Sequence, residues 1–223
     1  RGLGDVYKRQ IGVFQTQEEI DSYISPATGK PIQPNAAPGD TKFEDLNGDG
    51  VISDDNEDRT MIGKPNPDWM VGLTVAADWN GFDLSAFFQG SFGADVFDAL
   101  RRYELAAVNY TSDALERWTG PGTSNSMPRI VLGDTPKNFR PSTLLVHDAS
   151  FLRLRNLQVG YTLPAQLTRK AYIQRLRFYA SFDNLLTITG YKGMDPEIGS
   201  TMGIDKGVYP QARVYTFGLN LTF

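Results

Sequence analysis

The chain has 223 residues and a formal net charge of −4, from 22 Lys and Arg against 26 Asp and Glu. This mild charge, without a basic stripe, argues against a nucleic-acid partner. Cysteine is absent, which excludes disulfides and thiol chemistry. No apolar run approaches the ~18 residues of a transmembrane helix, so only a closed β-barrel would let this chain cross a membrane, because lipid offers backbone groups no hydrogen-bond partner.

The first ten residues carry no apolar segment of the kind found in a signal peptide. Their sequence also resembles a read-through product of assembled sequence data, so we predict that residues 1–10 are an artefact or an unrelated leader. For an outer-membrane protein, the lack of a signal peptide would mean that the true N-terminus is missing.

Residues 11–68 are expected to form a long loop region. Thr16 followed by Glu19 has the spacing of a capping box, which predicts a short helix over residues 17–24. The stretch 25–40 is rich in Pro, Gly and Ala, which predicts irregular structure.

An acidic repeat within this loop region has the spacing of a calcium-binding loop. Oxygen-bearing side chains alternate from residue 45 to residue 53 around a glycine at the sixth position, which suits a hard cation. The twelfth position holds Asn56 in place of the usual Glu, and Asp58 follows two residues later, where a small insertion would have moved the last ligand. The alternative is a solvated acidic turn held by Asx hydrogen bonds. The predicted ligands of this structural Ca²⁺ site are Asp45, Asn47, Asp49, Val51, Ser53 and Asp58.

Two strands of similar length follow, over residues 69–79 and 82–92. Apolar and polar residues alternate in both, as expected for a strand with two different faces. Asn80-Gly81 between them is a strong signal for a two-residue hairpin, because a type I′ turn needs φ > 0 at both central residues.

Residues 93–145 are expected to form a long insertion that contains short helices. Asp95 is placed to cap a helix that runs to about Val108, and a second short helix is expected to end at Trp118. Tyr103, Tyr110 and Trp118 are the residues of this insertion that we expect to contact a substrate or a partner protein.

Two further strands are predicted over residues 149–163 and 176–189. The apolar set of the first changes phase between Leu154 and Leu157, which predicts a β-bulge at Arg155–Asn156. Arg153 and Arg155 alternate with leucines, so in a barrel they would point into the lumen, where charge is tolerated.

The last strand, over residues 213–223, alternates without interruption, and every second residue from Tyr215 to Phe223 is apolar. At ~3.3 Å per residue such a strand reaches roughly 36 Å, and a tilt near 45° brings its height to about 25 Å. This is the height of the apolar band of a membrane barrel.

Long and short connections alternate along the chain. Outer-membrane barrels have short periplasmic turns and long extracellular loops. The sequence therefore predicts an all-β fold, an antiparallel meander of about five long transmembrane strands within a larger outer-membrane barrel, since five strands cannot close one. The long connections, 11–68, 93–148 and 190–212, would be extracellular. The alternative is a soluble carbohydrate-binding β-sandwich module of a secreted multidomain protein.

A series of motifs resembles the C-terminal part of SusC/RagA-type TonB-linked outer-membrane receptors, from about Gly12 to Phe223. They include Pro38-Gly-Asp40, Asp45-Leu-Asn-Gly-Asp-Gly-Val-Ile52, Asp58-Arg-Thr-Met-Ile-Gly63, Asn66-Pro-Asp-Trp69, Glu116-Arg-Trp118, Ser150-Phe-Leu-Arg-Leu-Arg-Asn156, Gly160-Tyr-Thr-Leu-Pro164, Asn184-Leu-Leu-Thr187, Tyr191-Lys-Gly-Met-Asp-Pro-Glu197 and Tyr209-Pro-Gln-Ala-Arg213.

The resemblance implies a barrel of about 22 strands with an N-terminal plug, in a Gram-negative outer membrane. It implies that TonB, with ExbB and ExbD, drives import through the plug, a region absent here, and that a SusD-like lipoprotein caps the barrel. The imported substrate would be a glycan fragment or a peptide.

No enzymatic activity is predicted. The only histidine, His147, lies at the edge of a loop, and no Gly-x-Ser-x-Gly elbow is present. Asp195 and Glu197 resemble a glycosidase pair, but they lie in a motif that recurs in the non-enzymatic family.

Overall fold

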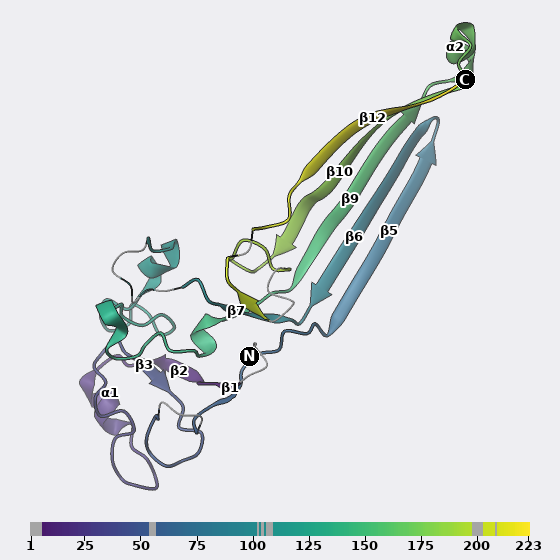
Figure 1. The fold of residues 1–223 in the computed structure, drawn as a ribbon. Helices are drawn as coiled ribbons and strands as arrows, with labels where there is room; N and C mark the ends of the chain where they lie inside the picture. The colour runs from purple at the N-terminus through teal and green to yellow at the C-terminus, as the bar shows by residue number, and fades with distance from the viewer. Residues whose placement is uncertain are drawn as a thin grey trace. The chain divides into compact units, whose positions relative to one another are not determined.

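The computed structural model describes residues 6–53, 57–101, 103, 105, 109–197, 203–207 and 209–223 (Figure 1). The chain forms two compact units. Unit 1 comprises residues 1–65, 96–147 and 201–207, and unit 2 comprises residues 66–95, 148–200 and 208–223. Along the described parts of the chain, no helix is both long enough and apolar enough to cross a membrane.

Unit 2 is built on a five-stranded sheet in the order β12-β10-β9-β6-β5. All neighbours are antiparallel, and strands that follow one another within this sheet are adjacent in space, which is a meander (Figure 1). This confirms the predicted fold. The strands are β5 (Trp69–Trp79), β6 (Phe82–Phe92), β9 (Phe151–Thr162), β10 (Arg175–Thr189) and β12 (Val214–Thr222).

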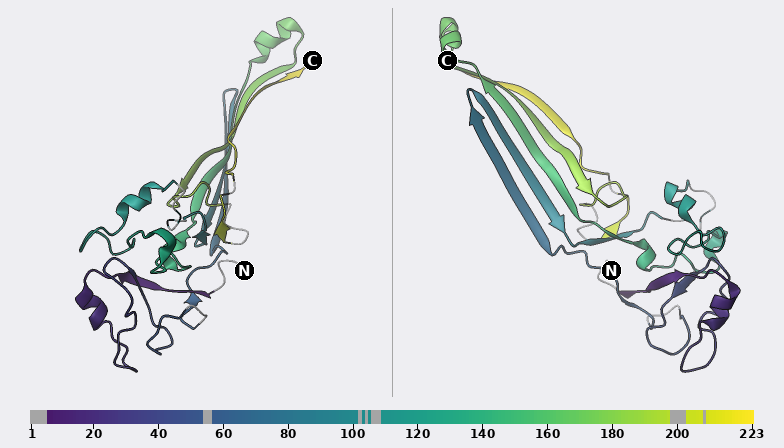
Figure 2. Two further views of the ribbon diagram at one scale, coloured as in Figure 1. Left: turned by 60° about the vertical axis from the view of Figure 1, so that its left-hand side comes forward. Right: turned by 180° about the vertical axis from the view of Figure 1, so that it is seen from behind.

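The short connections lie at one end of this sheet (Figure 2). Asn80 and Gly81 join β5 to β6 with φ values of 47° and 87°, as the predicted type I′ turn requires. The connection from β9 to β10 contains α2 (Ala165–Thr168) and the 3₁₀ helix η4 (Arg169–Ala171).

The two faces of the sheet differ in chemistry. Phe178 on β10 is paired with Tyr161 on one side and with Leu219 on the other, so an apolar row crosses three strands on one face. On the opposite face Gln89 is paired with Arg153. Because side chains alternate along each strand, the pairing keeps apolar residues on one face and polar residues on the other.

The predicted bulge in β9 is confirmed. Phe87 is paired with Asn156 and the next residue, Phe88, is paired with Leu154, so Arg155 is an extra residue in β9. An extra residue of this kind reverses the alternation beyond it. This is why the outward leucines change from even to odd numbers along the strand.

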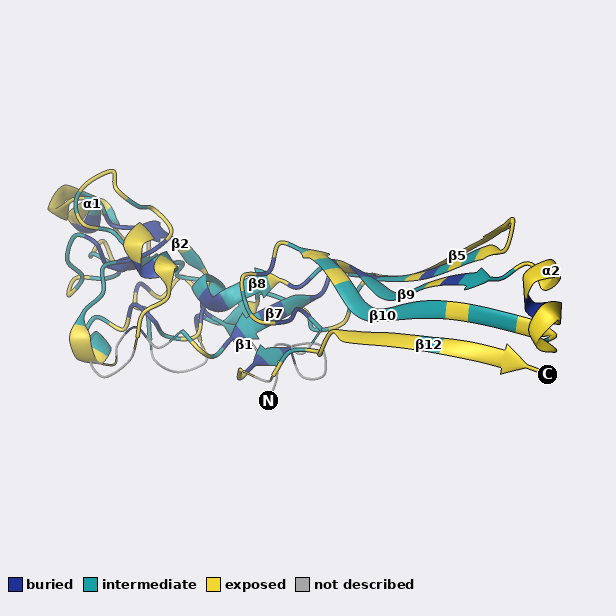
Figure 3. Ribbon diagram, turned by 90° about the horizontal axis from the view of Figure 1, so that it is seen from above, coloured by how far each residue is buried: buried dark blue, intermediate teal, exposed yellow. Residues whose placement is uncertain are grey.

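The apolar face of the sheet is exposed, and Figure 3 shows the edge strand β12 coloured as exposed along most of its length. Phe217 on β12 is 74% exposed, and Phe178 on the interior strand β10 is 48% exposed. A β-sandwich would cover these side chains with a second sheet. Within the described residues, unit 2 has a single layer of strands, which argues against the alternative of a soluble sandwich.

Unit 1 contains short strands and helices. Its larger buried side chains include Phe14, Ile20 and Phe43, and a second cluster is formed by Tyr103, Ala114, Met127 and Phe139. Its strands are β1 (Val6–Tyr7), β2 (Gln10–Val13), β3 (Thr41–Phe43), β4 (Thr60–Met61), β7 (Asp95–Asp98), β8 (Val146–Asp148) and β11 (Ile204–Asp205). Its helices are α1 (Gln17–Ser22) and the 3₁₀ helices η1 (Ser112–Glu116), η2 (Leu132–Asp134) and η3 (Thr143–Leu145).

Helix α1 begins where the sequence predicts, with Thr16 as its N-cap, and it ends two residues before the predicted end. The predicted helix from Asp95 to about Val108 is wrong at its start, because Asp95–Asp98 forms β7 between β8 and β11. Residues 102, 104 and 106–108 lie outside the described residues. A short η1 replaces the second predicted helix.

The described residues of the opening segment belong to the fold of unit 1. Val6–Tyr7 is paired with Thr60–Met61 in an antiparallel ladder, and Gln10 starts β2. The side chain of Lys8 is buried, with its Nζ 3.7 Å from Oδ2 of Asp58. Residues 6–10 belong to the segment predicted to be an artefact or an unrelated leader, and they take part in strand pairing and in an ion pair.

Candidate functional site

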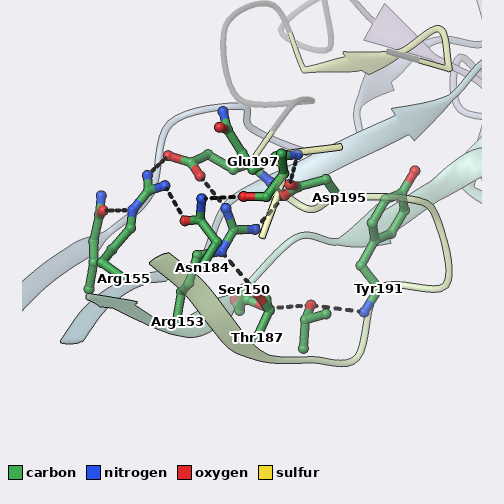
Figure 4. Close-up of polar contacts among 12 residues, drawn as sticks. Ser150, Arg153, Arg155, Asn184, Thr187, Tyr191, Asp195 and Glu197 are labelled. Atoms are coloured by element: carbon green, nitrogen blue, oxygen red, sulfur yellow. Dashed lines mark hydrogen bonds and ion pairs between the residues drawn. The ribbon is translucent and has the colours of Figure 1, made fainter. Parts of the chain in front are cut away.

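The most densely connected polar site lies on the polar face of the sheet in unit 2 (Figure 4). Two arginines of β9 meet two carboxylates of the loop between β10 and β12, and an asparagine of β10 joins them. We call this group the arginine–carboxylate cluster. Its members are Arg153, Arg155, Asn184, Asp195 and Glu197.

Arg153 is the buried centre of the cluster, with 2% of the residue exposed. Its Nη2 lies 2.6 Å from Oδ1 of Asp195, and its Nη1 lies 2.8 Å from Oε2 of Glu197. Its Nε donates to the Thr187 hydroxyl at 2.9 Å, and its guanidinium carbon lies 5.3 Å from the ring centre of Phe151. Each nitrogen of the guanidinium thus has an acceptor, as a buried charge requires.

Arg155 is the bulged residue of β9, and it reaches the same carboxylate from the other side. Its Nε donates to Oε1 of Gln89 at 2.6 Å, its Nη1 donates to Oδ1 of Asn184 at 3.1 Å, and its Nη2 contacts Oε1 of Glu197. Glu197 therefore uses one oxygen for each arginine. The bulge lets Asn156 follow Arg155 on the polar face, whereas regular alternation from Arg153 would have turned Asn156 outward.

A second irregularity, in β10, ties the far end of the loop to the sheet. The pairing of β10 with β9 shifts between Asp183 and Leu186, and Asn184 has a left-handed φ of 52°, a conformation that asparagine tolerates. The Nδ2 of Asn184 donates to the carbonyl of Ala212 at 3.0 Å. Asn184 thus connects the cluster to the residues just before β12.

Asp195 organises the loop itself. Its Oδ1 accepts the Glu197 backbone N–H at 3.0 Å, and its Oδ2 accepts that of Gln211 at 3.2 Å. Both arms of the loop are therefore held against the polar face of β9 and β10. A cavity of about 380 Å³ remains, lined by residues of these strands, including Thr187, and by loop residues that include Arg213.

The geometry argues against the glycosidase reading of Asp195 and Glu197. A general acid needs a free path to its substrate. Here both carboxylates are bound by arginine, and the Asp195 side chain is only 4% exposed. The pair binds the arginines of β9 and holds the loop in place.

A second arginine–carboxylate pair lies on the polar face. Arg177 of β10 donates from Nε to Oδ1 of Asp83 at 2.9 Å, and its Nη2 contacts the other oxygen. Gly160 of β9 lies between them, and a Cβ there would be 2.4 Å from Nη2 of Arg177. A side chain at this position would therefore displace the Arg177–Asp83 pair from its present geometry.

The loop predicted to bind calcium folds around its own backbone. Asp45 accepts the N–H of Gly48 at 2.8 Å and that of Gly50 at 2.9 Å, and Gly50 has a φ of 85° that favours glycine. Further along, Asn47 accepts from the N–H of Asp49 at 3.0 Å. These are the Asx hydrogen bonds of the alternative reading, and they also form the tight turn that a calcium loop needs at its sixth position.

The last predicted ligand has partners of its own. Asp58 accepts the backbone N–H of Leu46 at 3.2 Å and that of Ser53 at 3.1 Å, and it lies beside Lys8. Among the described residues, no group of three or more His, Asp or Glu side chains is arranged to hold a metal ion. Asn56, at the twelfth position, lies outside the described residues.

The three aromatic residues of the insertion have different surroundings. Tyr103 is 3% exposed and packs on Phe139 with ring centres 5.2 Å apart, and its predicted contact role stays a prediction. Trp118 donates from Nε1 to Gln15 at 3.1 Å and lies against the backbone of unit 1. Tyr110 is 44% exposed, and its contact with a substrate or a partner protein stays a prediction.

Sequence reasoning treated the arginines and the carboxylates of the cluster separately and missed their pairing. The residues are more than forty positions apart in sequence, and no local spacing joins them. One chemical property of the sequence could have indicated the pairing, because two arginines that face a barrel lumen need anionic partners. The predicted bulge already placed Arg155 at an irregular position of the strand, where an anionic side chain can approach it.

No family model matches the chain. The TonB-dependent receptor P3 of Formosa agariphila is 32% identical over 243 residues, covering 99% of this chain and 24% of the relative. The TonB-dependent receptor SusC of Bacteroides thetaiotaomicron is 31% identical over 220 residues, covering 98% of this chain and 20% of the relative. The chain thus spans about a quarter or less of the length of these relatives.

Solved structures show the same fold. A RagAB peptide importer in an open-open state matches with a TM-score of 0.70 and 24% identity, over 98% of this chain and 22% of that one. A RagAB peptide transporter matches with a TM-score of 0.67 and 31% identity, over 83% of this chain and 21% of that one. The long-stranded sheet and the loops of unit 1 are both included in a match that covers nearly the whole chain.

Proposed function

We propose, from the premise that this chain is a segment of a SusC/RagA-type TonB-dependent receptor, that it forms part of the wall and the loops of an outer-membrane importer. One observation supports this most directly. The sheet of unit 2 has an exposed apolar face and a polar face with ion pairs. In a barrel the first face meets lipid and the second lines the lumen.

Strand dimensions and sheet edges agree with this assignment. Strands β5 and β6 have 11 residues each and β10 has 15, longer than the ~5–6 residues of an average strand. The sheet ends at β5 and β12, and each of them pairs with one neighbour within it. Further strands of a longer protein would pair with these two edges and close the barrel.

The arginine–carboxylate cluster would shape the lumen. It fixes the loop between β10 and β12 on the polar face through ion pairs that involve Asp195 and Glu197. A loop held on the lumen side narrows the path of a solute at that end of the barrel. We infer that these residues serve the channel by holding the loop, without contributing a reaction.

The partners and the substrate follow from the relatives as proposals. We propose a SusD-like lipoprotein as the surface partner, and TonB with ExbB and ExbD as the energy source through a plug elsewhere in the longer protein. The substrate class is a glycan fragment or a peptide, and the solved neighbours include a peptide importer. Tyr110 is the exposed aromatic residue that we expect at a contact with the substrate or the lipoprotein.

The experiment that tests the assignment uses the full-length gene product. We expect it in the outer-membrane fraction, and we expect its migration on a denaturing gel to change on heating, as is typical of a folded barrel. Recovery as a soluble monomer without detergent would overturn the proposal.

For the acidic loop we propose a structural Ca²⁺ site. The turn at Gly50 and the buried position of Asp58 support it, and no other chemistry is assigned to the ion. The ligands would be Asp45, Asn47, Asp49, Val51, Ser53 and Asp58.

Calcium titration of the EDTA-treated full-length receptor tests this site. We expect a dissociation constant of roughly 10⁻⁴ to 10⁻³ M, as in extracellular calcium modules, and about tenfold weaker binding for Asp45→Asn. Asp21→Asn, on α1, serves as the matched control. If calorimetric titration shows no heat of Ca²⁺ binding for either the wild type or Asp45→Asn, the loop does not bind Ca²⁺. The Asx turn alone would then account for the acidic repeat.

A further inference from the structure

The connection between β9 and β10, residues 164–174, carries exposed cationic and apolar side chains. It contains α2 and η4 and lies at the same end of the sheet as the Asn80-Gly81 turn (Figure 1). Short connections of an outer-membrane barrel face the periplasm, at the level where lipid head groups meet water.

Hydrogen bonds fix the backbone of this connection. The N–H of Gln174 donates to the carbonyl of Thr222 on β12 at 2.8 Å, which ties the connection to the sheet. The N–H of Ile173 donates to the carbonyl of Thr168 at 3.2 Å, and Thr168 is buried. Exposed side chains on a backbone held in this way need little ordering when a ligand binds, which lowers the entropic cost of binding.

Two positive charges of the connection have no partner in the chain. Arg169 and Lys170 are both exposed, and neither forms an ion pair within the part of the chain that the structure describes. The sequence holds no Asp or Glu from residue 149 to residue 182. Among the acids of the neighbouring strands, Asp83 is already bound by an arginine of β10, and Asp78 lies on β5, the far edge of the sheet. The two cations therefore favour an anionic group from outside the chain.

Tyr172 adds an exposed aromatic ring directly after the cations. It caps η4 with a left-handed φ of 58°, at a position that glycine or asparagine usually occupies because a Cβ is unfavourable there. Its side chain is 91% exposed, so packing within the described chain does not offset this cost. Leu167, on α2, is 60% exposed. A ring with a polar hydroxyl is suited to the boundary between lipid and water.

A row of apolar side chains crosses the same end of the sheet. Its members are paired from strand to strand in the order Trp79, Phe82, Tyr161, Phe178 and Leu219. Trp79 is 76% exposed, and the rings of Phe82 and Tyr161 lie with their centres 4.4 Å apart. Aromatic residues gather in this way where a barrel meets the lipid–water interface. The connection is thus continuous with the face of the sheet that we assign to lipid.

We propose that the connection between β9 and β10 binds the head group of an anionic phospholipid in the periplasmic leaflet of the outer membrane. The phosphate contacts Arg169 and Lys170, while Leu167 and Tyr172 lie between the head groups and the acyl chains. The apolar residues beside the cations favour a lipid over free phosphate, which offers them no contact. This site rests on the proposed function, because only a sheet that spans the membrane brings the connection to lipid.

The test measures which lipid lies beside the connection in the full-length receptor. A fluorophore is attached at Ala171→Cys, an exposed position, after any cysteines elsewhere in the protein are replaced, since this chain has none. The receptor is inserted into phosphatidylcholine nanodiscs that contain nitroxide-labelled phosphatidylglycerol or, at the same mole fraction, nitroxide-labelled phosphatidylcholine. We expect phosphatidylglycerol to quench the fluorophore roughly twofold more strongly or better, and we expect added salt to reduce this preference.

Charge variants assign the preference to the two cations. Arg169→Gln combined with Lys170→Gln is expected to make the two lipids quench equally, because each cation near the surface contributes about a fivefold preference for an anionic lipid. Arg169→Lys combined with Lys170→Arg keeps both charges and is expected to keep the preference, which separates lost charge from lost folding. The matched control is Lys30→Gln with Lys206→Gln, two exposed lysines of unit 1, and it is expected to behave like the wild type.

A separate variant tests the ring. Asparagine tolerates the left-handed conformation, so Tyr172→Asn keeps the turn and removes the aromatic side chain. We expect weaker quenching by both labelled lipids, with the preference for phosphatidylglycerol retained. Unchanged quenching by both lipids would contradict the position of Tyr172 at the interface.

Equal quenching by the two lipids in the wild type overturns the proposal, as does an unchanged preference when both cations are replaced by glutamine. Absence of quenching by either lipid also overturns it, and would leave a periplasmic protein as the occupant of the exposed connection. Failure of the proposed function is a different result, because the receptor would then neither insert into the discs nor be recovered with the outer membrane.

Discussion

A guanidinium that is almost fully buried shows how this protein tolerates charge on the polar face of its sheet. Arg153 reaches the oxygens of Asp195, Glu197 and Thr187 with its three nitrogens. Removing a charged group from water costs several kcal/mol, and good geometry with complete hydrogen bonding is needed to offset this cost. The arginine, with its planar fork, satisfies these acceptors at once, which the single ammonium group of a lysine does not.

Replacement of Arg153 by Met is therefore expected to destabilise the folded receptor by about 3–5 kcal/mol, because it leaves Asp195 buried without its cation. The loop between β10 and β12 should then detach from the polar face. We expect faster proteolysis within residues 190–213 and a lower temperature for the heat-induced change in gel migration.

Two further variants test whether the effect of Arg153→Met comes from the unpaired carboxylates. Arg213→Met removes an exposed arginine of the same loop and is expected to change neither readout. Arg153→Met combined with Asp195→Asn and Glu197→Gln should recover part of the loss, because the unpaired carboxylates are gone. A single Arg153→Met variant with wild-type proteolysis would show that the cluster does not hold the loop.

At the scale of elements, α1 illustrates a helix defined by its first turn. The Thr16 hydroxyl accepts the N–H of Glu19 at 3.3 Å, and Oε2 of Glu19 accepts the N–H of Gln15 at 2.8 Å. Burial raises the pKa of Glu19, but the Gln15 N–H and the Lys42 ammonium outweigh burial and hold this pKa below its ordinary value. The carboxylate is thus stabilised in its charged form at the start of the helix.

This lowered pKa predicts a pH dependence for α1. Because the folded-state pKa of Glu19 lies below its unfolded value of about 4.3, its contribution is present above that pH and is lost as pH falls through the folded-state value. We expect hydrogen-exchange protection of residues 14–23, corrected for intrinsic rates, to fall as the pH drops below about 4.3. Glu19→Gln should flatten this dependence, and Asp21→Asn should keep it. The same pH profile in Glu19→Gln and in the wild type would contradict the assignment.

The elements that could be predicted from sequence are those with a strong local pattern. The strands of unit 2 alternate because one face meets an apolar environment and the other a polar one, so their period is visible in the residues themselves. Asn80-Gly81 fixed the hairpin, and the phase change around Arg155 located the bulge. Each of these signals lies within a few residues of the feature that it predicts.

Elements that depend on distant partners escaped prediction. Asp95–Asp98 has a pattern that is also compatible with a helix, and it becomes a strand because β8 and β11, about fifty and a hundred residues later, pair with it. Tertiary pairing here overrides local propensity. The arginine–carboxylate cluster escaped for the same reason, because it joins residues of β9 to loop residues more than forty positions away, and this separation carries no local signal.

For the chain as a whole, the exposed apolar face and the two outer strands require a partner that the chain does not supply. Phe217, Leu219 and Leu221 alternate along β12, and 74%, 59% and 41% of their surfaces are exposed. Strand edges with open backbone groups beside such a face are templates for aggregation in water. Lipid on the face and further strands at the edges would remove both liabilities together.

The 223-residue chain expressed alone is therefore expected to aggregate in detergent-free buffer, whereas the full-length receptor in detergent is expected to elute as a discrete species from a size-exclusion column. Phe217→Ser combined with Leu219→Ser makes the β12 face polar and should reduce aggregation only in part, because both backbone edges stay open. The matched control is Leu115→Ser, since Leu115 is 80% exposed and belongs to unit 1, not to the sheet. A monodisperse monomer with a cooperative unfolding transition in water would instead mean that the apolar face needs no lipid, and the chain could not then be a segment of a barrel wall.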